Sequence, residues 1–344
     1  MAFSQKLLFA PIVSVLIALP QPLNGVAQEI LTIQSKTSEQ PSKRRGQILD
    51  WQGNVIAFDS GSRKIEIDSS TVIELETDWP AGTAEARQLL AQRRLREALE
   101  RFESAQKLEQ RTWARHMILA EQIQCLTALE QYFEAAQKFR TIVEADPQTR
   151  FFHLIPLAWD SIAQPVHPEF ANWMDSPVET ARLIGASRSL VGPSRKQAIE
   201  TLERLRHDAT PNVAMLAASQ LWRTDAGADQ QAIERWKMQL ERTPKSLRCG
   251  PYFVLGTALA TQGQTDEAVL YLMRLPIIYP RNESLAATAL VRSAILLKEV
   301  GQSEQATTLL REILRNYPDS TWAARATELM AEQSNTTNSR DTDD

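Results

Sequence analysis

Hydrophobic and polar positions follow two different periods along the chain. Between residues 46 and 77 they alternate with a period of two, and turn residues such as Gly53 and Gly61 separate the runs. From Trp79 almost to the C-terminus the period is that of a helix. The sequence therefore predicts a mostly α protein in which a β module at 46–78 precedes a helical region at 79–332. The expected strands are Gln47–Trp51, Asn54–Asp59, Arg63–Asp68 and Thr71–Glu76, with Ile48, Val55, Ile65, Ile67, Val72 and Leu75 as inward residues.

The β module is short, and the spacing of its glycine and apolar residues resembles that of small SH3- or Sm-like barrels. A meander or barrel-like module of this length buries too little apolar surface to be stable alone. We therefore expect it to pack against the first helix, with Trp51 or Trp79 at the contact, and to cap the N-terminal end of the helical region. Residues 28–45 are polar and aperiodic, and we interpret them as a flexible lead-in.

One unit recurs through the helical region. An Ala is followed by a large apolar residue four positions later and by another apolar or small residue near the helix end, often with a Pro beyond. A small side chain lets two antiparallel helices approach closely, and Pro ends the second helix. Each helix pair leaves a face uncovered until the next pair stacks on it. The anchors Ala98, Ala135, Ala198, Ala232, Ala268 and Ala306 lie 37, 63, 34, 36 and 38 residues apart.

The clearest copies of this unit are residues 252–280 and 289–318. The first carries Leu255-Gly256, Gly263, Ala268 and Pro280, and the second carries Leu297, Gly301, Ala306, Leu310 and Pro318 at matching positions. This pattern resembles the tetratricopeptide repeat (TPR) family. The resemblance implies a TPR-like right-handed α-solenoid of about six helical pairs. Residues 182–223 match less well and resemble a HEAT unit at least as much.

The sequence from Tyr279 and from Tyr317, a Tyr-Pro pair followed by an Ala-rich helix, is similar to that of exported TPR proteins of bacterial envelopes. Examples are the coordinator of the Tol-Pal system and the BamD component of outer-membrane protein assembly. The N-terminus agrees with export. Lys6 is the sole charge in the first 28 residues, and an apolar run from Leu7 to Leu19 precedes small residues before Gln28. This is the layout of a cleaved secretory signal at 1–27, and the apolar run is too short for a membrane span. A retained anchor is the alternative. We therefore expect a periplasmic or cell-envelope protein.

The composition and motifs contain no sign of catalysis. The net charge of −4 gives no electrostatic footprint for nucleic acid. No catalytic motif is present, and the histidines at 116, 153, 167 and 207 share no metal-ligand spacing. Cys125 and Cys249 are expected to be two buried thiols. We therefore predict no enzymatic activity, no cofactor and no metal site. Residues 333–344 are expected to form a disordered tail.

The 63-residue spacing marks an insert at 148–180, rich in Pro and aromatic residues. Two interpretations stay open. The insert is either a recognition loop over the groove, with Trp159 and Phe170 as anchors, or a structural plug that buries its aromatic residues.

The favoured function is a scaffold that binds a protein or peptide partner. The family resemblance implies that exposed first-helix positions line a concave groove, which gives Tyr252, Thr257, Arg292 and Lys298 as contact residues beside Trp159 and Phe170. The alternative is a structural envelope component attached through its β module, with the solenoid as a spacer.

Overall fold

The computed structural model describes residues 28–34, 40–160, 167–225, 227–318 and 320–340. The chain forms two compact units. The first comprises residues up to Leu49 together with Ala57–Asp78, and the second comprises Asp50–Ile56 together with Trp79 onward. The expected signal segment 1–27 lies outside the described residues. Within the described residues, no helix has both the length and the apolar character that crossing a membrane requires.

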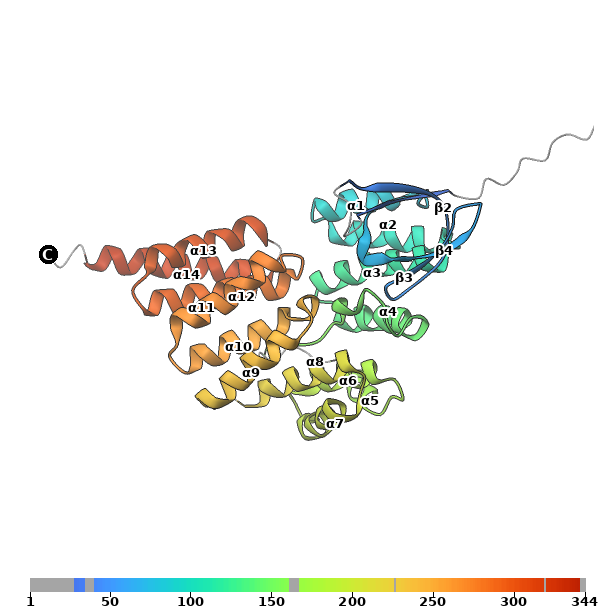
Figure 1. The fold of residues 1–344 in the computed structure, drawn as a ribbon. Helices are drawn as coiled ribbons and strands as arrows, with labels where there is room; N and C mark the ends of the chain where they lie inside the picture. Colours follow the sequence, from blue (N-terminus) through green and yellow to red (C-terminus); the bar gives the residue numbers. More distant parts are fainter. Residues whose placement is uncertain (1–27, 35–39, 161–166, 226, 319, 341–344) are drawn as a thin grey trace, which may run out of the picture. The chain divides into compact units, whose positions relative to one another are not determined.

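The first unit is built around an antiparallel sheet (Figure 1). Its spatial order is β4-β3-β2-β1-β5, with β4 and β5 at the two edges, so the sheet is open and the barrel-like prediction is wrong. β1 pairs with both β2 and β5. β1 and the start of β2 lie in residues 28–45, which we expected to be a flexible lead-in. The strands are β1 (Glu29–Ile33), β2 (Ser42–Gln52), β3 (Val55–Asp59), β4 (Lys64–Asp68) and β5 (Val72–Glu76), and a 3₁₀ turn, η1 (Ser69–Thr71), precedes β5.

A buried carboxylate holds β1 in place. The side chain of Glu29 is fully buried, and it accepts hydrogen bonds from the Ile48 backbone N–H at 2.8 Å and the Thr77 hydroxyl at 3.4 Å. Of the residues predicted to point inward, Ile48 and Ile67 are buried, whereas Val55 is 47% exposed. Its neighbour Ile56 is buried instead. β3 therefore has the opposite facing to the one we predicted, because a one-residue shift exchanges the two faces of a strand.

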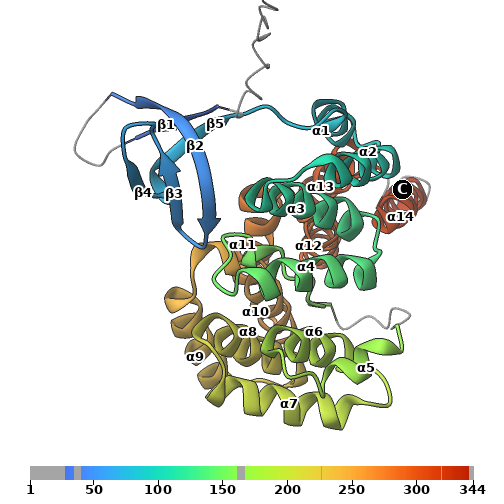
Figure 2. The same cartoon turned by 90° about the vertical axis from the view of Figure 1, so that its right-hand side faces the viewer.

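The second unit consists of stacked helix pairs with an insert between the second and third pairs (Figures 1 and 2). The pairs are α1 (Thr83–Ala91) with α2 (Leu95–Leu108), α3 (Thr112–Ala128) with α4 (Tyr132–Ala145), α6 (Glu179–Ser189) with α7 (Arg195–Asp208), α8 (Pro211–Leu221) with α9 (Gln230–Arg242), α10 (Cys249–Thr261) with α11 (Thr265–Ile278), and α12 (Glu283–Glu299) with α13 (Ser303–Asn316). The insert holds η2 (Phe152–Leu154) and α5 (Glu169–Trp173), while η3 (Trp222–Thr224) and η4 (Lys245–Leu247) flank α9. A last helix, α14 (Thr321–Arg340), continues into the segment that we expected to be disordered.

The recurring Ala residues lie where the repeat pattern places them. All six anchors fall in the second helix of a pair, and none is more than 5% exposed. In the fifth pair the approach is especially close. A Cβ at Gly256 of α10 would lie 2.9 Å from the Leu272 side chain and 3.3 Å from the Ala268 carbonyl of α11. The small residues therefore set the distance between the paired helices, as the spacing predicted.

The turns inside four pairs use the same left-handed backbone position. Gly263 and Gly301 supply it in the fifth and sixth pairs, with φ of 72° and 80°. In the first two pairs, Arg93 and Glu130 occupy it with φ of 62° and 60°. A residue with a Cβ costs roughly 1 kcal/mol or more in this conformation. The first two turns thus carry strain that the later ones avoid.

The turn between β2 and β3 belongs to the helical unit. Trp51 packs against Trp113 of α3 with ring centroids 6.3 Å apart, and Trp79 packs on the same ring at 6.1 Å. The backbone N–H of Gly53 donates to the buried carboxylate of Asp146 at 2.8 Å. We expected Trp51 or Trp79 to contact the first helix. Trp79 does so, because the guanidinium of Arg87 in α1 lies 4.2 Å from its ring centroid, and the aromatic partner that Trp51 and Trp79 share is Trp113 in the second pair.

Candidate partner-binding site

A segment of the insert contacts the first helix, or the turn after it, in four successive pairs. We call residues 156–160 the strap; they form neither helix nor strand. The strap lies against side chains from α6, η3 after α8, α10 and α12. Its partners therefore come from the first helix of each of these pairs or from the turn that follows it.

The main chain of the strap is held by buried and half-buried polar side chains. Arg188 of α6 donates to the Pro156 carbonyl at 3.1 and 3.0 Å and to the Leu157 carbonyl at 3.4 Å. Ser187 accepts from the Ala158 N–H at 2.9 Å. The Ala158 carbonyl in turn accepts hydrogen bonds from Gln220 at 2.9 Å and Arg223 at 2.8 Å, and Arg223 also donates to the Asp160 carbonyl at 2.8 Å.

Two side chains of the strap also have specific partners. The Asp160 carboxylate accepts from the Arg292 guanidinium at 2.8 Å, and Arg292 donates to the Thr257 hydroxyl at 3.2 Å. The Trp159 ring lies on the bare backbone of Gly250, where a Cβ would come within 1.9 Å of the ring. Glycine is therefore required at position 250 for the ring to lie there.

Three arginines, Arg188, Arg223 and Arg292, place positive charge along the strap. Burial lowers the pKa of Arg188 and of Arg223 to about 10, so both stay protonated at neutral pH. Arg188 also stacks on the Tyr132 ring, 3.7 Å from its centroid. The Nε of Arg223 is buried without a hydrogen-bond partner. This group therefore has spare donor capacity.

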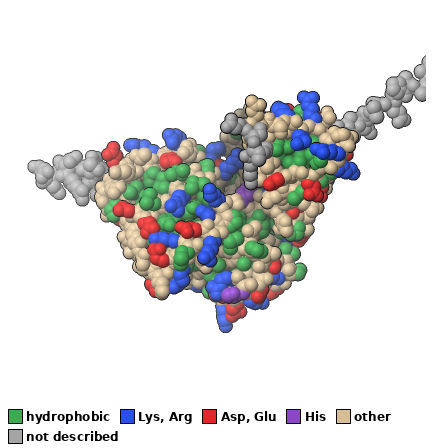
Figure 3. Space-filling model, in the orientation of Figure 1, with side chains coloured by type: hydrophobic (Ala, Val, Ile, Leu, Met, Phe, Trp, Pro, Cys, Tyr) green, Lys and Arg blue, Asp and Glu red, His purple; other side chains and the backbone are tan. Residues whose placement is uncertain are grey.

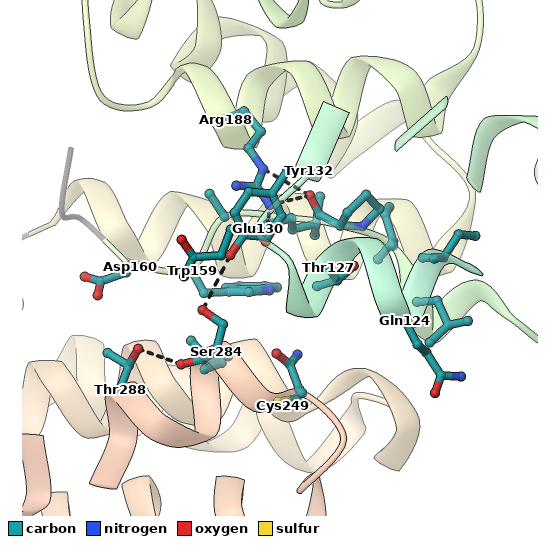
Figure 4. A pocket seen from close by; sticks show the side chains of 18 of the residues that line it. Gln124, Thr127, Glu130, Tyr132, Trp159, Asp160, Arg188, Cys249, Ser284 and Thr288 are labelled. Carbon is teal, nitrogen blue, oxygen red and sulfur yellow. Dashed lines mark hydrogen bonds between the residues drawn. The ribbon is translucent and has the colours of Figure 1, made fainter. Parts of the chain in front are cut away.

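A cavity of about 1120 Å³ adjoins the strap. Its walls come from the α3–α4 turn, the strap, the α11–α12 turn and the start of α14. Figure 4 shows Tyr132, Trp159, Ser284 and Thr288 around this space. Cys249 also lines it, and burial raises the pKa of this thiol to about 12. The wall is more apolar than polar, and Arg281 and Arg325 add positive charge to it.

Contacts between the first two helix pairs and the C-terminal helices α12–α14 border this cavity. Arg93 forms a bidentate ion pair with Glu283 at 2.8 and 2.7 Å and donates to the Asn316 carbonyl at 3.0 Å. Thr321 donates to Glu130 at 3.4 Å. We call these contacts the clasp. Its two N-terminal members, Arg93 and Glu130, are the residues in the left-handed turns. Strained backbone often marks such functional contacts.

The predicted contact residues have different positions in the structure. Trp159, Thr257 and Arg292 come together at the strap. Tyr252 is 7% exposed and packs among Tyr271, Tyr279 and Arg274, so the predicted exposure is wrong.

The other two predicted residues have different partners, and Phe170 also lines the cavity. Lys298 pairs with Glu332 of α14 at 3.8 Å. Phe170 is 2% exposed and meets Phe133 and Trp173 edge to face. α5 therefore fills the interior, as the plug interpretation predicted.

The sequence pattern did not single out Ser187, Arg188, Gln220 and Arg223. They lie in the pairs that match the repeat least well. Within the described residues, no group of three or more His, Cys, Asp or Glu side chains could hold a metal ion. Neither cysteine forms a disulfide; Cys125 is buried and Cys249 is half-buried. On the face shown in Figure 3, acidic and basic side chains are intermingled.

Comparison with known proteins identifies one repeat. The model of the tetratricopeptide repeat family matches residues 288–320, which span most of α12 and all of α13. No curated protein matches the sequence. A solved structure, the TPR2AB-domain:pHSP90-complex of yeast Sti1, is 14% identical and covers 74% of this chain and 97% of that chain, with a TM-score of 0.23. A score this low does not establish a common fold.

Proposed function

We propose that this protein is a non-enzymatic scaffold whose helical unit binds a protein or peptide partner. The observation that carries the proposal is the inner surface at the strap. Residues from the first helix of four successive pairs, or from the turn after it, contact the strap there, beside a cavity of about 1120 Å³. The match of residues 288–320 to the tetratricopeptide repeat family supports it. Repeat arrays of this kind commonly use such surfaces for binding.

Crosslinking-mass spectrometry in the native cell tests the proposal, because it also identifies the partner. Arg281 and Arg325 line the cavity. The double charge reversal Arg281→Glu, Arg325→Glu is expected to remove the crosslinks between the partner and the cavity wall. The matched control is Arg311→Glu, an exposed position on α13 outside the cavity wall. Partner crosslinks that persist in the double variant would contradict the assignment of the site.

We further propose that the protein is exported to the periplasm or cell envelope. The support is the sequence of residues 1–27, with one positive charge, an apolar run and small residues before Gln28. N-terminal sequencing of the mature protein tests this proposal. The expected first residue is Gln28, and a retained Met1 would contradict cleavage.

A second candidate function is attachment of an envelope component through its sheet. The sheet is open, and Ile73 on the edge strand β5 is 60% exposed. Edge strands with exposed backbone groups can pair with a partner strand. Ile73→Lys is expected to abolish localisation to the envelope if β5 is the attachment point. The Arg281→Glu, Arg325→Glu variant would retain it.

A further inference from the structure

The strap makes the contacts that a bound peptide would make. It forms neither helix nor strand, and six hydrogen bonds from Arg188, Gln220 and Arg223 end on its carbonyl oxygens. These bonds do not depend on which side chains the strap carries. The inner surface therefore binds main-chain carbonyl groups whatever the side chains of the segment, and a segment from another protein could satisfy the same donors.

Specificity comes from the last two strap residues. Gly250 leaves room for a flat aromatic ring, which Trp159 fills. Arg292, held by Thr257 and lying 4.9 Å from the Phe253 ring, binds the Asp160 carboxylate. The surface thus selects an aromatic residue followed by an acidic one.

The charge of the surface favours an acidic segment over the strap itself. Arg188, Arg223 and Arg292 all donate to the strap, which contributes a single carboxylate. Arg188 and Arg223 donate to carbonyl oxygens, although guanidinium groups form stronger hydrogen bonds with carboxylates. Arg223 also keeps a buried Nε without a partner. An additional carboxylate at this position would be better bound than the neutral carbonyls of the strap.

We propose that the strap occupies, within the same chain, the binding site of an extended acidic peptide with an aromatic–acidic pair. This inference rests on the proposed function and specifies its ligand. The strap is tethered to the site and therefore competes at high effective concentration. The apparent affinity for the partner is lowered in proportion to the fraction of molecules in which the strap has left the surface.

Fluorescence anisotropy with a labelled synthetic peptide tests the inference. The probe carries the sequence of residues 155–160, Ile-Pro-Leu-Ala-Trp-Asp, which includes the strap, and a second probe has Asn in place of its Asp. Asp160→Asn weakens the strap and leaves the surface unchanged. Because it removes a charge-assisted hydrogen bond, it is expected to raise the affinity for the acidic probe about tenfold.

Arg292→Ala should have a different effect, because the probe needs this guanidinium. It is expected to abolish the preference for the acidic probe over the Asn probe. Lys298→Ala is the matched control. It removes a cation from the same helix α12, but one that pairs with Glu332 of α14. Its probe affinity should equal that of the unaltered protein.

Hydrogen exchange gives a second measurement on the unaltered protein. The Ala158 N–H donates to Ser187 and should exchange slowly in the free protein. Saturating acidic probe should speed exchange in the strap, because the probe replaces it. Equal probe affinity of Asp160→Asn and the unaltered protein would overturn the inference, and so would unchanged strap exchange at probe saturation. Persistent native crosslinks at the cavity would then leave the proposed function standing.

Discussion

The contact between Gly250 and Trp159 gives a test of the strap position. The effect of Gly250→Ala on the free energy of unfolding should have opposite signs in the presence and absence of Trp159. A Cβ added at Gly250 would lie 1.9 to 2.4 Å from atoms of the Trp159 ring, closer than any real contact. The ring must therefore move or the helix must shift. Forced overpacking of this kind costs about 1–3 kcal/mol.

An opposing effect acts at the same position. Gly250 lies in the first turn of α10, and replacing Gly by Ala in a helix gains up to about 1 kcal/mol. We therefore expect Gly250→Ala to lower the free energy of unfolding by about 1 kcal/mol in the presence of Trp159. In a Trp159→Ala background the clash is absent. The same substitution should then raise the free energy of unfolding, by up to about 1 kcal/mol.

The assay is urea unfolding of the four proteins of the double-mutant cycle, followed by far-UV circular dichroism. Gly227→Ala is the control, because a Cβ there meets nothing within 4 Å. Its effect should be the same in both backgrounds. Stabilisation by Gly250→Ala in the presence of Trp159, or an equal effect in both backgrounds, would refute the reasoning.

Three further predictions concern other parts of the helical unit. Arg93→Ala removes the ion pair with Glu283 and should lower the free energy of unfolding by about 1 kcal/mol or more. Arg93→Gly loses the same ion pair but relieves the strain of the left-handed turn, so in urea unfolding it should be about 1 kcal/mol more stable than Arg93→Ala. Asp146→Ala leaves the buried Gly53 N–H without its acceptor and should cost about 1–3 kcal/mol by thermal unfolding, with Asp146→Asn costing less. Burial raises the pKa of the Cys125 thiol from 9.0 to about 12, so above pH 9 the thiol ionises in the unfolded chain before it does so in the folded protein. The contribution of the neutral thiol to the free energy of unfolding is therefore complete below pH 9 and is lost between pH 9 and pH 12. Over that range the free energy of unfolding should fall less for Cys125→Ala than for the unaltered protein.

The helix pairs were predictable because their determinants are local. Ala268, Gly263 and Pro280 specify the close approach, the turn and the end of one pair within a short stretch, and the same logic holds for the sixth pair. β1 escaped prediction because it is short, lies in polar surroundings, and is held by the buried Glu29 carboxylate. Glu is usually exposed in proteins, so the sequence alone gives no sign that the Glu29 carboxylate is buried.

The contact residues were predicted less well, because a repeat pattern identifies the helix more securely than the direction of a side chain. Successive residues of a helix are rotated by about 100°. Tyr252 and Thr257 therefore point about 140° apart, and both cannot face the strap. The strap itself was beyond prediction, because Asp160 binds Arg292, which lies 132 positions further along the chain.

The distance along the chain between the partners at the strap and clasp has a consequence for how the array unfolds. In an ordinary solenoid each repeat contacts only its neighbours, so terminal repeats can melt independently. Here Asp160 is joined to Arg292 and Arg93 to Glu283, across 132 and 190 residues. Loss of the last pair thus removes support from the first. The array should therefore melt as one cooperative body, and its non-local contacts should slow its folding relative to open arrays of the same length.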